Sequence, residues 1–490
     1  MWGIPTLTLI LCVGIFVSFC TGFAQITLFP KAIKSFFQQF RQKGEPGQLT
    51  PYQALCTALA ATVGTGNIAG VAGAISLGGP GAIFWMWVCA FFGMAIKYAE
   101  ATLALFYRQK NRDGEYVGGP MYMIREGLPK RLHWLAGLYS FFGVVAAFGV
   151  GNATQVNAVI DSMTGLLSAY QIPTPGWLRI TIGMFLALVI GGILLGGAKR
   201  IGTIAQALVP FASVLYILIS LFVLGLCCDR IPVAFQAILQ GAFSPRAVTG
   251  GFVGSIFTAV RVGSSRGIFT NEAGMGTASI AHASAQVSHP AQQGLMGIME
   301  VFIDTVVICT LTALVILCSG ISVPYGMDAG AELTSAAFSS VLGDWVRMIL
   351  TAALCAFAVA TVLGWGLYGL RCAQYLFGDG VWKRFVYIQI ITVIVSSALR
   401  TGTVWLIAET VNGLMAIPNL IALLFLSRKL AELTKTYKNM IGRKSAVGGT
   451  YEDIHQRKPL RTLTYAEIPP SGRKGKEGWQ ENISPEHRSA

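Results

Sequence analysis

Long apolar segments separated by short polar loops recur along most of the chain. Most are about twenty residues or longer, the length that an α-helix needs to cross the hydrocarbon core of a bilayer. The pattern predicts an all-α polytopic membrane protein with about eleven transmembrane helices. The predicted spans are residues 5–28, 54–77, 81–107, 133–163, 178–198, 202–227, 249–270, 293–320, 344–371, 382–399 and 403–427.

The run TVGTGNIAG at residues 62–70 interrupts the second of these spans. It is a poor helix former, because each glycine costs roughly 1 kcal/mol against alanine in a helix interior. Backbone that leaves the helix inside a membrane must be buried in protein or line a cavity, and transporters have such breaks near the bilayer midplane. The alternative is close helix packing through small residues.

Without the first helix, the ten remaining spans divide into two sets of five, residues 54–227 and 249–427. Because five is odd, the second set must enter the membrane with the opposite orientation, as in the inverted repeats of many transporters. Corresponding helices of such repeats are expected to be broken. The first helix of the second set contains TAVRVGSSRG at residues 258–267, and we expect its break there.

Basic residues gather in alternate loops, in the linker 31–53 and in the tail 428–490. The positive-inside rule then predicts an N-terminus outside the cell and a C-terminus in the cytoplasm. Residues 1–30 lack the basic start of a signal peptide and are interpreted as a retained extra helix. The tail, rich in Gly, Pro, Ser and charge, is predicted to be disordered.

Composition limits the function classes. The chain is 54% hydrophobic and 12% charged, so its net charge of +14 indicates membrane orientation and not a nucleic-acid partner. Most of the ten cysteines lie in apolar segments, and no CxxC pair, HExxH run, phosphate-binding loop or nucleophile elbow occurs. We therefore expect no enzyme, no cofactor and no ATP-driven transport, and we infer no obligate protein partner.

Polar groups inside the spans are candidates for binding. Three amides at residues 152–157 lie deep in the fourth span and must face protein or a cavity. Gln155, with Phe148 on the same face, is the candidate for the substrate; interhelical hydrogen bonding is the alternative. Trp365, four residues after Thr361, projects on the same face as that threonine and could wall a pocket. The alternative is an indole at a helix interface.

Acids inside spans are functional candidates by default. Glu300 and Asp304, spaced i and i+4, face the same way, so we expect either that one of them stays protonated or that they have a basic partner. Lys97 and Glu100, one turn apart, are expected to pair with each other. We interpret these acids as members of gates or structural ion pairs, with the basic partner of the first two drawn from Arg261, Arg266 and Arg371.

Residues 58–72 contain no carboxylate. If the substrate is an α-amino acid, its own carboxylate could approach a cation held near Asn67, whose amide oxygen suits sodium. The N-terminal end of the half-helix would supply backbone N–H donors. The candidate substrate-binding residues at this end are Gly66, Asn67, Ile68 and Ala69.

The runs GGPGAIFWMWV at residues 78–88 and AFFG at 90–93 resemble the alanine/glycine:cation symporter family, the family of sodium:alanine symporters. NEAGMG at 271–276 and GGPMY at 118–122 are similar to family motifs as well. The resemblance covers residues 1–430. It implies a leucine-transporter-like fold of ten core helices in two inverted repeats, preceded here by one extra helix.

The resemblance also implies two cation regions. One lies near the substrate, with the Thr62 carbonyl and Asn67 as candidate ligands. The other lies between the first and eighth core helices, with the Ala60 and Val63 carbonyls and the Thr361 hydroxyl. For Thr361 the alternative is an ordinary hydroxyl that bonds back to its own helix.

These observations predict a sodium-coupled symporter that imports a small neutral amino acid, alanine or glycine, by alternating access. It would lie in the plasma membrane, as a multi-pass protein of a bacterial inner membrane. Proton coupling or a preference for glutamine in the same fold is the nearest alternative. A channel is the more distant one.

Overall fold

The computed structural model describes residues 4–39, 49–112, 114–243, 247–249, 252–254, 256–399 and 401–447, without the side chains of 247–254, 401–409 and 443–447. Its elements are α1 (Ile4–Thr21), α2 (Ala24–Thr27), α3 (Phe29–Gln39), α4 (Pro51–Thr62), η1 (Gly66–Gly70), α5 (Val71–Gly78), α6 (Gly81–Phe106), β1 (Gln109–Lys110), β2 (Tyr116–Val117), α7 (Pro120–Gly127), η2 (Lys130–Leu132), α8 (Trp134–Phe148), η3 (Gly149–Ala153), α9 (Thr154–Ala169), α10 (Gly176–Leu194), α11 (Gly197–Leu226), η4 (Cys228–Arg230), α12 (Ile231–Phe243), β3 (Ala247–Thr249), β4 (Phe252–Gly254), α13 (Ile256–Asn271), α14 (Thr277–His282), α15 (Pro290–Val301), η5 (Phe302–Cys309), α16 (Thr310–Cys318), α17 (Ala331–Leu342), α18 (Val346–Phe377), η6 (Asp379–Val381), α19 (Trp382–Ala398), α20 (Thr401–Phe425) and α21 (Ser427–Val447).

The helix that begins with α4 is broken where the sequence predicts it. Thr50 and Gln53 form a capping box at its start, in which each side chain accepts the backbone N–H of the other residue. The helix ends at Val63, whose ψ of 103° is extended, and resumes as η1 and α5. The two parts are bent by 51°. The break predicted at residues 62–70 is therefore confirmed.

The second break lies elsewhere than predicted. Residues 258–267 belong to the continuous helix α13, and the chain leaves the helix only after Asn271. Between α13 and α14, Glu272, Gly274 and Gly276 all have positive φ values, of 53°, 93° and 76°. The small residues of 258–267 serve packing instead: a Cβ on Gly263 would lie 2.9 Å from that of Trp85 on α6, so the two helices approach closely.

Seven helices of the described chain are long and apolar enough to cross a membrane, and nine are when each bent pair counts as one span. The bent pairs are α4 with η1 and α5, and residues 410–425 with 427–442. Two predicted spans fall outside this count: the first, whose apolar helix covers only Pro5–Thr21, and the seventh, where α13 has only 16 residues. The fold class is confirmed, and the number eleven stays a prediction.

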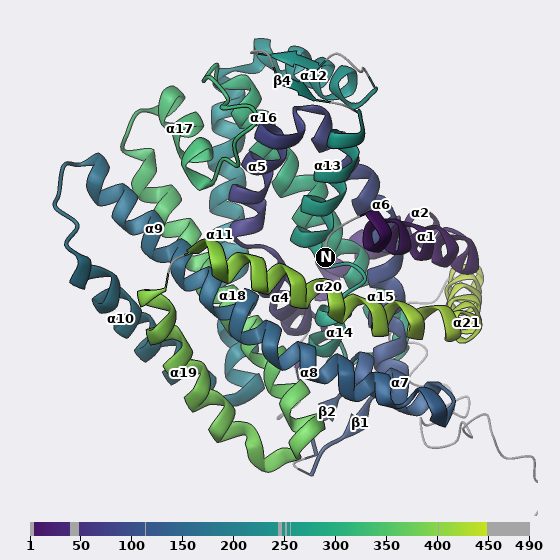
Figure 1. Ribbon diagram of the computed structural model, residues 1–490. Coiled ribbons are helices and arrows are strands. Elements are labelled where there is room, and N and C mark those ends of the chain that lie inside the picture. Colours follow the sequence, from purple (N-terminus) through teal and green to yellow (C-terminus); the bar gives the residue numbers. More distant parts are fainter. Residues whose placement is uncertain are drawn as a thin grey trace, which may run out of the picture. The chain divides into compact units, whose positions relative to one another are not determined.

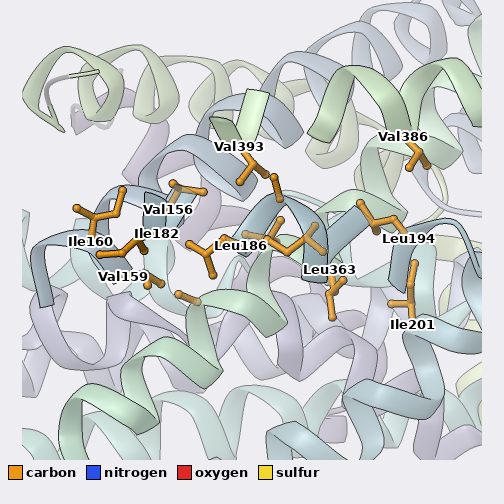
Figure 2. Packing of buried hydrophobic residues seen from close by; sticks show 14 of the residues in the cluster. Val156, Val159, Ile160, Ile182, Leu186, Leu194, Ile201, Leu363, Val386 and Val393 are labelled. Carbon is orange, nitrogen blue, oxygen red and sulfur yellow. The ribbon is translucent and has the colours of Figure 1, made fainter. Parts of the chain in front are cut away.

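Figure 1 shows α12, α17 and the β3–β4 hairpin at one end of the helices, and α7 with the β1–β2 hairpin at the other end. Both hairpins are antiparallel. Away from the breaks, apolar side chains of α9, α10, α11, α18 and α19 form a buried cluster that includes Val156, Leu186 and Leu363 (Figure 2). Through this cluster α9 and α18, the two helices that face the breaks, pack against each other and against α10 and α19.

Two segments outside the predicted core differ from expectation. The linker predicted at 31–53 contains most of helix α3, and residues 40–48 lie outside the described residues. The tail is not disordered from residue 428, because α21 occupies Ser427–Val447 and buries Leu430 and Thr434. Residues 448–490 lie outside the described residues.

Candidate functional site

A cavity of about 640 Å³ lies between the two broken helices, α9, α17 and α18. The first break lines it with Gly66, Ile68 and Ala69, all of which the sequence predicts as substrate-binding residues. Asp328, whose side chain is 60% exposed, stands at its rim and forms an ion pair of 3.0 Å with Arg266 of α13. The cavity therefore leads from the α17 side of the molecule to the backbone of the first break.

Asn67 is buried behind this backbone and does not line the cavity. Its Oδ1 accepts the Gly64 N–H at 2.8 Å, and its Nδ2 donates to the carboxylate of Asp304 at 2.7 Å and to the Asp304 carbonyl at 3.0 Å. Asn67 thus holds the break open and ties it to η5. Its role as a cation ligand stays a prediction.

The first break has no carboxylate in its own sequence, but the fold brings one to it. Asp304, distant in sequence, places Oδ1 against Asn67 and accepts the Thr305 hydroxyl on Oδ2 at 2.7 Å. Thr305 in turn accepts a bond of 3.2 Å from Asn271, the last residue before the second break. A continuous chain of hydrogen bonds therefore connects the two breaks through one buried acid.

The three amides of α9 and η3 divide between the two alternatives. Asn152 donates to the Gln389 carbonyl at 3.0 Å and Asn157 to the Ser396 carbonyl at 3.2 Å, so both bind α19 as interhelical bonds. Gln155 faces the first break, where its Oε1 accepts the hydroxyl of Thr65 at 3.3 Å. Thr65 lines the cavity and lies between the cavity and Gln155, which does not line it.

Besides Asn67 and Gln155, three predicted substrate-binding residues do not line the cavity, namely Phe148, Trp365 and Thr361. Phe148 packs on Phe385 of α19, with ring centroids 5.2 Å apart. Trp365 is fully buried, and its indole Nε1 donates to Glu272 at 3.0 Å. The cavity lining on α18 extends no deeper than Leu354, so all three binding roles stay predictions.

The predicted cation ligands gather where α4 ends. The Gly64 N–H, which would bond the Ala60 carbonyl in an unbroken helix, is taken by Asn67 instead. Thr361 of α18 approaches the same point, since a Cβ on Gly64 would lie 2.8 Å from its hydroxyl oxygen. That hydroxyl donates to the Phe357 carbonyl at 3.0 Å, and Thr62 donates to the Ala58 carbonyl at 3.3 Å. The Val63 carbonyl lies at the same helix end.

The second break is held by carboxylates. Oε1 of Glu100 on α6 accepts the backbone N–H groups of Gly274 and Gly276 at 3.0 and 3.1 Å and the amide of Asn419 at 2.7 Å. Glu272 accepts the Thr277 hydroxyl at 2.6 Å, in addition to Trp365. Both acids are buried, and Glu100 satisfies the Gly274 and Gly276 N–H groups that the break releases.

The ion pairs differ from those expected. Lys97 does not pair with Glu100; its ammonium lies 2.8 Å from Glu300, which also contacts His282 at 3.0 Å. None of the three predicted arginines serves Glu300 or Asp304. Arg266 pairs with Asp328, Arg371 pairs with Glu115 at 2.7 Å, and Arg261 is exposed.

Two residues were underestimated from the sequence. Asp304 was identified as a membrane acid but not as a neighbour of the first break, because no sequence spacing brings α4 and η5 together. Glu272 was noted only as part of the NEAGMG motif. The available signal for Glu272 is its position in the sequence: it follows an asparagine and precedes two glycines at the end of an apolar helix, where a buried acid indicates a functional role.

A chain of many apolar helices with two broken helices beside a cavity has the architecture in which transporters bind ions and substrates. Its fold is similar to that of the crystal structure of MhsT in complex with L-phenylalanine, with a TM-score of 0.55 over 80% of this chain and 99% of that one. The sequences are 14% identical, so this likeness concerns the fold.

The sequence profile of the sodium:alanine symporter family matches residues 1–447, and the chain belongs to this family. It is 43% identical to the sodium/alanine symporter AgcS of Methanococcus maripaludis, over 90% of this chain and 95% of that protein. It is 36% identical to the probable sodium/glutamine symporter GlnT of Bacillus subtilis, over 89% and 88%. The protein is a multi-pass amino-acid transporter of the symporter type and not an enzyme.

Proposed function

We propose that this protein imports a small neutral amino acid, alanine or glycine, together with sodium across the plasma membrane by alternating access. The observation that carries the proposal is the cavity that ends on the first break. There, backbone released from helical bonding meets Asn67, and Asp304 lies directly behind it. Broken helices of this kind bind ions and charged substrate groups in transporters.

In this proposal sodium binds where α4 ends. The Ala60 carbonyl, freed because Asn67 takes the Gly64 N–H, is one ligand. The Val63 carbonyl and the Thr361 hydroxyl are the other ligands of this cation region, and a second region nearer the substrate is formed by the Thr62 carbonyl and the amide oxygen of Asn67. The Asp304 carboxyl group lies 2.7 Å from Asn67 and would favour the cation in its ionised form.

The amino acid would lie in the cavity, with its carboxylate at the N–H groups of Gly66, Asn67, Ile68 and Ala69. The positive end of the half-helix favours that charge. Gln155 would reach the substrate through the Thr65 side, while Phe148 and Trp365 would limit its size from behind. Cation and carboxylate then stabilise each other, which couples the two fluxes.

The charge pattern of the loops supports an N-terminus outside, so the cavity side would face the exterior. The five-helix sets at 54–227 and 249–427 would form the two repeats, with residues 1–30 as an added helix and the tail in the cytoplasm. The membrane potential would then drive sodium inward by roughly 2.3 kcal/mol per charge per 100 mV. We propose the bacterial inner membrane as its location. The lipid bilayer is the proposed environment, and no obligate protein partner is proposed.

Uptake of labelled alanine into proteoliposomes tests the proposal. We expect uptake in an inward sodium gradient and at most a small fraction of it when potassium replaces sodium. Competition by unlabelled glycine should be strong and by glutamine weak. Sodium-independent uptake would refute the cation assignment, and stronger competition by glutamine than by alanine would refute the substrate.

Proton coupling is the second candidate, and Asp304 is the observation that favours it, because a buried carboxyl can carry a proton. Asp304→Asn separates the two. Under sodium coupling, the sodium concentration for half-maximal uptake should rise about tenfold, since a negative charge beside the ligand Asn67 is lost. Under proton coupling, uptake driven by a pH gradient should disappear and sodium should have no effect. Asp229→Asn, an exposed acid after α11, is the matched control.

A further inference from the structure

Glu272 makes a contact that the proposed binding site does not use. Its carboxylate accepts the indole N–H of Trp365 at 3.0 Å and the hydroxyl of Thr277 at 2.6 Å. The residue has a φ of 53°, in the left-handed region that is costly for a side chain of this type. Among the described residues no basic side chain hydrogen-bonds it. A strained, buried acid thus connects the second break to α18.

Trp365 closes the structure below the cavity. It stands eleven residues beyond Leu354, the deepest cavity-lining residue of α18, which corresponds to about 16 Å along a helix. Its side chain packs directly on Gly151 of η3, where a Cβ would lie 2.6 Å from the indole Cγ. One residue before it, Gly364 touches Ala61 of α4. Trp365 therefore fills the place where α4, η3 and α18 meet.

Both broken helices converge on this place. α4 packs against α14 and against α18, so the short helix that follows Glu272 and the helix that carries Trp365 enclose the lower half of the first broken helix. The bond from Glu272 to Trp365 is the side-chain link between the second broken helix and α18 at this level. Separation of α4 and α14 from α18 requires this bond to break.

We propose that Glu272 is a positioning residue that holds Trp365 in the barrier below the cavity. The Glu272–Trp365 bond acts as a latch on the closed side: it is made while the cavity is open and is broken when the opposite side opens. This proposal rests on the proposed transport function, because only alternating access requires the barrier to open. A hydrogen bond to a buried carboxylate suits a latch, since it is strong when formed and is lost entirely on separation.

The thiol of Cys56 provides the measurement. Cys56 is fully buried in α4, on the closed side, and becomes reachable when α4 separates from α14 and α18. The internal control is Cys318, which is buried and is the last residue of α16. The rate of labelling by N-ethylmaleimide is followed at each cysteine by peptide mass spectrometry of the full-length protein in proteoliposomes.

We expect Glu272→Ala and Trp365→Phe each to raise the labelling rate of Cys56 about tenfold, with Cys318 unchanged, because each removes the same bond. The double variant should label no faster than either single one. Glu272→Gln, whose amide oxygen still accepts the indole N–H, should label like the wild type. Trp365→Phe keeps the ring, so it reports on the bond even if Glu272→Ala fails to fold.

Unchanged labelling of Cys56 in Trp365→Phe would overturn the proposal, and so would additive effects in the double variant. Fast labelling of Glu272→Gln would show that the charge of Glu272, and not its bond to Trp365, closes the barrier. Labelling requires neither sodium nor an amino acid. If the uptake experiment shows no sodium dependence, the labelling rates can therefore still be interpreted. If the labelling rates contradict the latch, the proposed sodium coupling is unaffected.

Discussion

The two broken helices satisfy their released backbone groups with different chemistry. At the first break a neutral amide, Asn67, accepts the Gly64 N–H, and the residues that follow line a cavity. At the second break Glu100 accepts two N–H groups, while Glu272 binds side chains on either side. The first break presents backbone to a cavity, whereas at the second break the Gly274 and Gly276 N–H groups are bonded to a side chain of the protein itself.

This difference assigns separate tasks to two similar interruptions. A break that faces a cavity can exchange its partners with a bound ion or substrate, so substitutions there should alter transport before they alter stability. A break that is buried and bonded to acids must keep its partners, because an unsatisfied buried group costs about 1–3 kcal/mol. Substitutions there should alter stability first. Three substitutions test this contrast, in order of decreasing effect.

Gly276→Ala should have the largest effect. Gly276 has a φ of 76°, and a Cβ there would collide with Pro120 and lie 2.7 Å from Asn419 Oδ1. The left-handed conformation costs alanine roughly 1–2 kcal/mol, and overpacking adds about 1–3 kcal/mol. We expect a much lower yield of folded protein and a strongly lowered melting temperature in detergent.

Gly137→Ala is the matched control for this substitution, because a Cβ at Gly137 of α8 would have no atom within 4 Å. It should leave the melting temperature unchanged or slightly raised, because alanine is favoured over glycine inside a helix. A wild-type melting temperature for Gly276→Ala would mean that the second break is not held rigidly, and the contrast between the two breaks would fail.

Glu100→Ala should have the next largest effect. It removes the acceptor of the Gly274 and Gly276 N–H groups and of the Asn419 amide, so we expect a loss of about 3 kcal/mol in the free energy of unfolding. Glu100→Gln keeps one oxygen that can accept these donors and should lose less. Thermal unfolding followed by tryptophan fluorescence measures both variants. Equal losses would indicate that the charge, and not the acceptor, stabilises the break.

The sequence predicted the first break but misplaced the second for a physical reason. Glycine and serine weaken a helix and also permit close packing, and the pattern alone does not separate the two effects. At residues 62–70 the small residues break the helix, whereas Gly263 in the second run lets α13 approach α6. The actual second break is marked by Gly274 and Gly276, whose positive φ values only the fold reveals.

The partners of the buried charges could not be predicted from spacing either. Lys97 and Glu100 are neighbours on one helix, yet Lys97 binds Glu300, 203 residues away, and Glu100 binds the backbone of the second break. Buried charges choose partners through the packing of whole helices, here α6 against α15 and α13. The class of fold and the cavity-lining residues Gly66, Ile68 and Ala69 followed from local pattern and resemblance, because they depend on the chain near the break itself.

Gly64→Ala should have the smallest effect on stability and a clear effect on transport. The φ of Gly64 is not in the left-handed region, but a Cβ there would lie 2.8 Å from the Thr361 hydroxyl oxygen, so that side chain must move. We expect a cost of about 1 kcal/mol in stability, because the Thr361 hydroxyl is the one atom in close contact and its side chain can rotate. Because Thr361 is a proposed sodium ligand, the sodium concentration for half-maximal alanine uptake should rise several-fold.

Thr361→Ala in the Gly64→Ala background separates packing from ligation. It removes the collision, so the melting temperature should return toward that of the wild type, while the sodium requirement should stay high because the hydroxyl is gone. Recovery of both quantities would mean that Thr361 only fills space beside the first break. Recovery of stability alone would support the contrast between the two breaks. The polar groups at the first break would then serve to bind a ligand, whereas those at the second break stabilise the fold.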